Sequence, residues 1–227
     1  MCSLERVGDV YILRFTGDLD EHRLNPALCD EIIRNLAIVN ESDASALLTT
    51  NDGKYFSNGL DLAWVNQAPG SVSARMQSQS KAYFRLLSAF MLVNVPTVAA
   101  ICGHAAAGGL ILALAHDHRH MRQDKGFVYM SEMDISIPIP PRVMSLIRCK
   151  LNPRAFVETV LKGTKLTATK AKDLDIVDAV HGSSKETFDA ALAEATRLAS
   201  RRWKKEVYLS MRLTMYPQFV PRLEGRL

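Results

Sequence analysis

One stretch of this chain carries the parts of a chemical site at the spacing of a strand, a turn and a helix. Residues 97–102 are a β-branched and apolar run that predicts a buried strand, and residues 110–115 predict an apolar helix. Between them, residues 103–109 read Gly-His-Ala-Ala-Ala-Gly-Gly. The first backbone N–H groups of a helix have no partner inside that helix. Because Gly108 and Gly109 have no side chain, a ligand carbonyl can come close to those N–H groups.

A glutamate follows in a segment rich in apolar residues. Glu132 is surrounded in sequence by Phe127, Tyr129, Met130, Met133 and Ile135. Apolar surroundings disfavour the ionised form, which raises the pKa of a carboxyl and suits a general base. N–H donors and a desolvated carboxylate are the parts needed to form and hold an enolate. Two plainer interpretations remain open at this point: a salt-bridged strand glutamate, and a glycine pair that only permits close helix packing.

The composition limits the classes of protein to which this chain can belong. Its 227 residues are enough for one well-filled core, and 48% hydrophobic with 23% charged residues is typical of a globular protein. A net charge of +4 is too small to predict nucleic-acid binding. The four cysteines are far apart and form no C-x-x-C pair, which indicates a reducing compartment rather than disulfides or zinc. The amino terminus lacks the basic and then apolar run of a secretory signal.

A long uncharged stretch needs a separate explanation. No Asp, Glu, Lys or Arg occurs between Arg85 and Asp117, which is long enough for a membrane span. Pro96 and the glycines at 103, 108 and 109 interrupt it. We therefore expect a helix end, a short strand and a second helix in a buried core, and no membrane span.

Strands and helices alternate along the rest of the chain, which predicts an α/β fold. Asn25 and Pro26 are a helix cap and first position, Thr167 is a second cap, and Ser183 with Glu186 forms a capping box. Strands are expected at 10–15, 44–50 and 176–180, a loop at 54–62, and helices at 76–92 and from about 185 onward.

Three runs together resemble the crotonase, or enoyl-CoA hydratase/isomerase, superfamily. They are Phe56-Ser57-Asn58-Gly59-Leu60-Asp61-Leu62, the run 103–109, and Ser131-Glu132, in the order and spacing of that family. The resemblance extends from Val10 to about Leu198. It is nearest to the peroxisomal delta(3)-delta(2)-enoyl-CoA isomerases of plants.

The resemblance implies a fold, an assembly and a substrate. It implies a crotonase-like spiral of ββα repeats over 1–182 and a helical trimerisation region over 183–227, within one continuous domain. It implies homotrimers or hexamers, an acyl-CoA thioester substrate, no metal, and no cofactor, since coenzyme A is part of the substrate. Glu132 would be the base, and the N–H groups of Leu60 and Gly108 would bind the oxyanion. The residues expected to contact substrate are Ser57, Asn58, Gly59, Leu60, Asp61, Leu62, Gly108, Gly109 and Ile111.

One position separates the reactions within this family. Hydratases resemble one another in carrying a second Glu two residues after the glycine pair, and this chain has Ile111 there. Addition of water needs both carboxylates, whereas moving a double bond needs one base. The resemblance therefore implies an isomerase of 3-enoyl-CoA. The alternatives are hydration, thioester hydrolysis or decarboxylation of another acyl-CoA, and a non-catalytic acyl-CoA-binding subunit.

Several other features have a structural and a functional interpretation. His116, His118 and His120 could bind a metal, but the family needs none. The basic run 201–205 predicts a solvated helix face rather than a phosphate site, and Met130 and Met133 could line an acyl channel. Asp175, where many relatives have Gly, and the prolines at 138–141 depart from the family pattern.

The terminal Gly225-Arg226-Leu227 resembles a peroxisomal address, so we expect a peroxisomal location.

Overall fold

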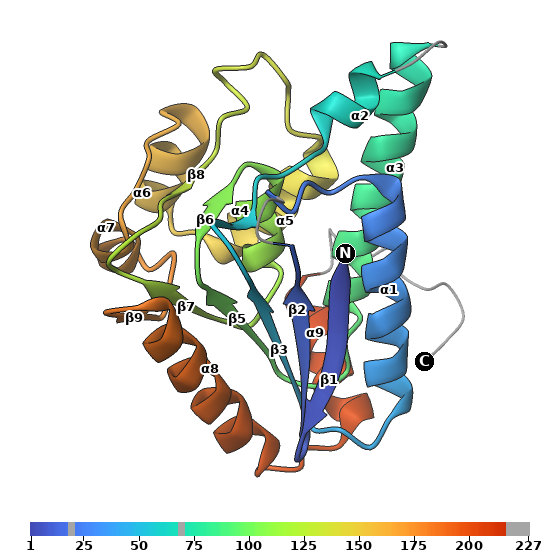
Figure 1. Cartoon of the computed structure of the whole chain (residues 1–227), viewed down its shortest axis with the longest axis vertical. Helices are drawn as coiled ribbons and strands as arrows, with labels where there is room; N and C mark the ends of the chain where they lie inside the picture. The colour runs from blue at the N-terminus through green and yellow to red at the C-terminus, as the bar shows by residue number, and fades with distance from the viewer. Residues whose placement is uncertain (18–20, 68–70, 217–227) are drawn as a thin grey trace.

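A computed structural model describes residues 1–17, 21–67 and 71–216 of the chain, and Figure 1 shows the arrangement of its elements. The main sheet has the strand order β1-β2-β3-β5-β7-β9 and a smaller sheet has the order β4-β6-β8. Apart from the antiparallel pair β1 and β2, the strands within each sheet are parallel. The strands are β1 (Cys2–Val7), β2 (Val10–Phe15), β3 (Ala46–Asn51), β4 (Tyr55–Ser57), β5 (Thr97–Ile101), β6 (His104–Ala106), β7 (His118–Arg122), β8 (Val128–Tyr129) and β9 (Ala179–His181).

The helices fill the connections between these strands. They are α1 (Pro26–Glu41), α2 (Leu62–Asn66), α3 (Val72–Met91), α4 (Gly108–Leu114), α5 (Pro141–Lys150), α6 (Pro153–Phe156), α7 (Ala168–Asp173), α8 (Ser184–Ala199) and α9 (Lys205–Met215), with one π-helical turn at Val157–Leu161.

The chain repeats a ββα unit, as expected. β3 and β4 precede α2 and α3, β5 and β6 precede α4, and β7 and β8 precede α5. The first strand of each unit joins the main sheet and the second joins the smaller sheet. In the second unit, this arrangement places α4 against β4 and β6 of the smaller sheet.

Helices pack against both faces of the main sheet. Successive side chains of a strand point to opposite faces, so neighbouring residues pack against different helices. Leu47 packs into the cluster formed with α1, α3 and α4, whereas Leu48 packs into the cluster formed with α8. β5 alternates in the same way, with Ala99 on the first side and Val98 on the second. In Figure 1, α1 and α3 lie on one side of the sheet and α8 on the other.

The expected helix caps are confirmed. Asn25 accepts the N–H of Leu28, Thr167 accepts the N–H of Lys170, and Ser183 accepts the N–H of Glu186. Asp175 has φ +57°, a left-handed conformation that glycine adopts most easily and that Asp tolerates. This explains how the departure from glycine at position 175 is accommodated.

Several predicted boundaries were wrong. β1 was missed, α3 begins at Val72 rather than Met76, and the loop 54–62 contains β4 and the start of α2. The strand expected at 176–180 is shifted to Ala179–His181. The segment around Glu132 forms a turn rather than a strand, closed by the Ile137 N–H donating to the Glu132 carbonyl at 3.0 Å. Over the parts of the chain described above, no helix combines the length and the apolar character needed to cross a membrane.

Candidate active site

The three sequence runs meet around one cavity of about 660 Å³. Leu60 comes from the loop after β4, Gly108 and Ile111 come from the first turns of α4, and Glu132 comes from the turn after β8. The rest of the wall consists of α3 and the segment that leads into α5. These residues are Met76, Gln77, Ser80, Lys81, Tyr83, Phe84, Ile137, Pro138, Ile139, Pro140, Pro141, Arg142 and Val143.

The start of α4 lies so close to the neighbouring loop that side chains are excluded there. A Cβ on Gly109 would overlap the backbone carbonyl of Ser57, and a Cβ on Gly59 would lie 2.9 Å from the Gly108 nitrogen. The preceding Ala107 has φ +49°, which turns the chain from β6 into the helix. The glycines therefore allow the Leu60 loop and the first turn of α4 to approach each other.

Two N–H groups are left available at this contact. Gly108 is the first residue of α4, so its N–H has no partner within the helix. Within the described parts of the chain, neither this N–H nor that of Leu60 donates to a loop carbonyl. Since both residues line the cavity, these N–H groups can bind an oxygen that carries negative charge.

The polar side chains of the loop hold its backbone in place. Ser57 is buried; its hydroxyl donates to the His22 carbonyl at 2.8 Å and accepts the Gly59 N–H at 3.2 Å. Asn58 donates to Glu21, and Asp61 caps α2 through the Trp64 N–H. Of the six loop residues predicted to contact substrate, Leu60 lines the cavity, while Ser57, Asn58, Gly59, Asp61 and Leu62 do not. Gly109 also lies outside the lining.

Glu132 has the environment of a base. Its Oε2 atom is buried and has no hydrogen-bond partner among the described residues. Burial raises the pKa of the Glu132 carboxyl above its ordinary value, although two backbone hydrogen bonds oppose the shift. No ion pair of Glu132 occurs in the described parts of the chain, so the salt-bridged interpretation is wrong.

The source of this burial is not the one that the sequence predicts. Phe127, Met133 and Ile135 are exposed, and Met133 has 62% of its surface accessible. Neither Met130 nor Met133 lines the cavity, so the predicted acyl channel at these methionines was wrong. The apolar wall comes instead from α3 and the segment 137–143. Sequence reasoning missed Tyr83 as a site residue because its spacing in α3 is that of an ordinary core position.

The remaining candidates are positioned for structural roles. His116 is buried and contacts the Leu112 carbonyl and the Thr49 hydroxyl, and His120 contacts His181 at 3.0 Å. In the described regions, no group of three or more His, Cys, Asp or Glu residues is arranged to hold a metal. The basic run 201–205 is solvated over residues 201–204, as expected, but the predicted helix face was wrong because α9 begins only at Lys205. Lys205 donates to the Ser42 carbonyl at 2.6 Å, just after α1.

Comparisons with known proteins give the relationship of the whole chain. The model of the enoyl-CoA hydratase/isomerase family matches residues 18–215. Enoyl-CoA delta isomerase 3 of Arabidopsis thaliana is 40% identical over 225 residues, covering 96% of this chain and 93% of the relative. The peroxisomal enoyl-CoA delta isomerase 2 of the same plant is 39% identical, with the same coverage.

Solved structures support the fold. An Mtb enoyl-CoA isomerase superposes with a TM-score of 0.85 at 19% identity, covering 96% of this chain and 92% of the other. A Mycobacterium ulcerans enoyl-CoA hydratase has the same TM-score and coverage at 18% identity. Because proteins described as an isomerase and as a hydratase superpose equally well, the fold does not distinguish the two reactions.

Proposed function

This chain belongs to the enoyl-CoA hydratase/isomerase family, and we propose that it converts 3-enoyl-CoA, with a cis or trans double bond, into trans-2-enoyl-CoA. The observation that carries the proposal is the site itself: two N–H groups that donate to no loop carbonyl, and a carboxylate whose buried Oε2 atom has no hydrogen-bond partner among the described residues, in an apolar cavity. The identity of about 40% to enoyl-CoA delta isomerases, over nearly all of the chain, supports the same reaction. This reaction serves the β-oxidation of unsaturated fatty acids.

The mechanism needs one proton to be removed and returned. Ionised Glu132 removes a proton from C2 of the substrate, and the electrons of that bond move onto the thioester oxygen. The N–H groups of Leu60 and Gly108 stabilise the resulting enolate. Protonated Glu132 then delivers its proton to C4, where the electrons of the C3–C4 double bond form the new C–H bond. The electrons between C1 and C2 of the enolate become the C2–C3 double bond, and the electrons on oxygen restore the thioester carbonyl. A carboxyl with a raised pKa is suited to both steps. Its ionised form is a stronger base toward the C2 proton, and its protonated form can still donate that proton to C4.

The reaction has no net oxidation and no added group, so we propose that it needs no cofactor. Coenzyme A arrives and leaves as part of the substrate. The proton that is removed is also returned, and backbone N–H groups supply the stabilisation of charge. No step therefore requires a metal or a redox group.

The cavity composition argues against hydration. Glu132 is the one carboxylate among the described residues that line it, and Ile111 occupies the position of the second acid. Asp61, which follows Leu60 in the adjacent loop, uses its side chain to cap α2 and to accept a hydrogen bond from Asn25. A water molecule would therefore have no second carboxylate to orient and activate it.

Incubation with 3-hexenoyl-CoA tests this proposal. We expect the ultraviolet absorbance of a conjugated 2-enoyl-CoA to appear and to persist, because the product is not hydrated. The same protein given 2-hexenoyl-CoA should form little 3-hydroxyacyl-CoA. Disappearance of the conjugated signal at a rate comparable to its formation would indicate a hydratase. Absence of any conversion would favour the non-catalytic acyl-CoA-binding subunit.

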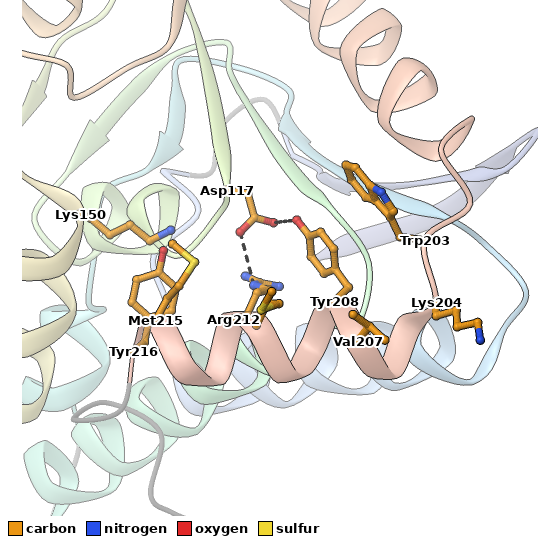
Figure 2. Close-up of a pocket in the computed structure, with 10 residues that line it drawn as sticks. Asp117, Lys150, Trp203, Lys204, Val207, Tyr208, Arg212, Met215 and Tyr216 are labelled. Carbon is orange, nitrogen blue, oxygen red and sulfur yellow. Dashed lines mark hydrogen bonds and ion pairs between the residues drawn. The ribbon is translucent and has the colours of Figure 1, made fainter.

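We also propose that the chain assembles as a trimer or a pair of trimers through the region 183–227. Trp203, Val207, Met211 and Met215 are exposed and follow one another at intervals of four residues. Four-residue spacing keeps the three helical members on one face of α9. A second cavity of about 630 Å³ lies beside this face, over the ion pair of Asp117 with Arg212 (Figure 2). An apolar face of this kind is stabilised by a partner subunit.

Met211→Asp is expected to weaken this assembly. A buried unpaired carboxylate is costly, so the variant should shift from three or six times the monomer mass toward the monomer. Light scattering after size-exclusion chromatography measures the change. Ser210→Asp, at the adjacent exposed position, is the matched control and should keep the wild-type mass. A monomeric wild type would contradict the proposal.

We propose a peroxisomal location as well. Two similar relatives are named peroxisomal, while enoyl-CoA delta isomerase 3 carries no location in its name. The tripeptide Gly225-Arg226-Leu227 lies outside the residues that the structure describes. A fluorescent protein fused in front of the last ten residues should collect in peroxisomes, and deletion of the tripeptide should release it. Diffuse fluorescence from the intact fusion would show that these residues are not the signal.

A further inference from the structure

Tyr83 connects the two halves of the site without belonging to either motif. It lies in the middle of α3, only 6% exposed, and its ring forms part of the cavity wall. Its hydroxyl donates to the Gly108 carbonyl at 2.6 Å. This hydrogen bond links α3 to the first residue of α4, which also lines the cavity.

The first turn of α4 needs such an anchor. Glycine pairs have the widest choice of backbone conformations, so Gly108 and Gly109 are not held by their own sterics. The Ser57 backbone confines Gly109 from one side. The Tyr83 ring confines Gly108 from another, since a Cβ on Gly108 would lie 3.3 Å from both the Cζ and the Oη atoms of Tyr83.

Tyr83 lines the same cavity as the base. Burial first, and then the negative charge of Glu132, raise the pKa of Tyr83 well above its ordinary value, so the hydroxyl keeps its proton. That proton is used in the hydrogen bond to Gly108 and is not donated to Glu132, whose Oε2 atom has no partner in the described regions. The Tyr83 hydroxyl therefore contacts the first residue of α4 without neutralising the Oε2 atom of Glu132.

We propose that Tyr83 is a positioning residue of the oxyanion site: its hydrogen bond to the Gly108 carbonyl aims the Gly108 N–H at the enolate oxygen. This inference rests on the proposed function in one respect: the kcat measurement below assumes that the protein isomerises 3-enoyl-CoA. It extends that function, because it assigns to a side chain on α3 the alignment of a backbone donor on α4.

Tyr83→Phe removes only the hydroxyl. The expected result is a fall in kcat of roughly 10- to 100-fold, the scale of a displaced donor, with an unchanged KM. Binding of acetoacetyl-CoA supplies a second readout, because its enolate has a distinct ultraviolet absorbance and forms without turnover. The affinity for that enolate should fall by the same factor as kcat. The midpoint of the pH profile, set by Glu132, should not move.

Tyr11→Phe, which removes a tyrosine hydroxyl on β2 from a residue that does not line this cavity, is the matched control and should behave as wild type in all three measurements. A Tyr83→Phe enzyme with wild-type kcat and enolate affinity would overturn the proposal. A raised KM with unchanged kcat would make Tyr83 part of the acyl wall only, and a shifted pH midpoint would mean that it acts through Glu132. Both results also reject the positioning role.

If Tyr83→Phe does not fold, 3-fluorotyrosine at position 83 replaces it. That side chain keeps the ring and has a more acidic hydroxyl, so the enolate affinity should equal or exceed that of wild type. A lower affinity would reject the positioning role. A wild-type protein that binds the enolate but does not isomerise 3-enoyl-CoA would refute the proposed function while leaving this inference intact.

Discussion

Replacing Glu132 by glutamine is expected to lower kcat for isomerisation by roughly 100- to 10,000-fold, the usual contribution of a general base. Glutamine keeps the size and much of the hydrogen-bonding capacity of the side chain but cannot remove a proton from C2. The affinity for acyl-CoA should survive, since the N–H groups of Leu60 and Gly108 and the apolar wall are unchanged. Stopped-flow turnover and calorimetric binding measure the two quantities separately.

The pH dependence of the wild type follows from the same residue. The pKa of Glu132 is raised by burial, so kcat/KM should increase with pH through a midpoint above the ordinary value for a glutamate. A raised carboxyl pKa contributes stability that is lost as pH rises through it. Glu132→Gln should therefore be as stable as the wild type at neutral pH, or more stable.

A nearby carboxylate outside the cavity supplies the control. Asp134 is exposed and lies two residues from Glu132. Asp134→Asn should retain wild-type turnover and the wild-type pH profile. The assignment of the base would fail if Glu132→Gln kept more than a tenth of the wild-type kcat.

Gly109→Ala should have a comparably large effect through the backbone. The added methyl group would overlap the carbonyl of Ser57, which is backbone and cannot rotate away. The loop that carries Leu60 and the first turn of α4 must then separate, so the two N–H groups no longer converge on one oxygen. Since loss of one such donor costs roughly 100- to 1000-fold in kcat, we expect a loss of at least that size.

This variant can also reduce stability, because the overlap lies in the buried part of the molecule. Acetoacetyl-CoA binding to the folded fraction, judged by circular dichroism, separates the two effects. Gly8→Asn is the control: it changes a left-handed glycine with no atom within 4 Å of its Cβ position. Wild-type turnover in Gly109→Ala would show that the close approach is not needed for catalysis.

Much of this site could be predicted because its parts are encoded locally. The Gly108–Gly109 pair at a strand-to-helix turn, and Asn25 as a helix cap, depend on neighbours within a few residues. The α/β class follows from the same local patterns, and the resemblance of three runs implied the ββα spiral. These features could be predicted because backbone conformation and helix capping depend on residues close together in the sequence.

The environment of Glu132 could not be predicted in this way. Its neighbours in sequence are apolar, yet Met133 and Ile135 are exposed, and the carboxyl is buried by residues some 50 positions earlier on α3 and by the segment that follows it. The role proposed for Tyr83 could not be predicted from the sequence for the same reason. A tyrosine at helical spacing has the pattern of core packing, and its partner, the Gly108 carbonyl, is 25 residues away.

The sequence by itself therefore determined which groups the proposed site contains: two backbone donors, one carboxylate, and an isoleucine in place of a second acid. Only the tertiary structure decided which of these groups face one another, and what removes water from them. Residue type and local turns are properties of short segments, whereas the desolvation of Glu132 and the hydrogen bond from Tyr83 to Gly108 depend on contacts between α3, α4 and the turn after β8.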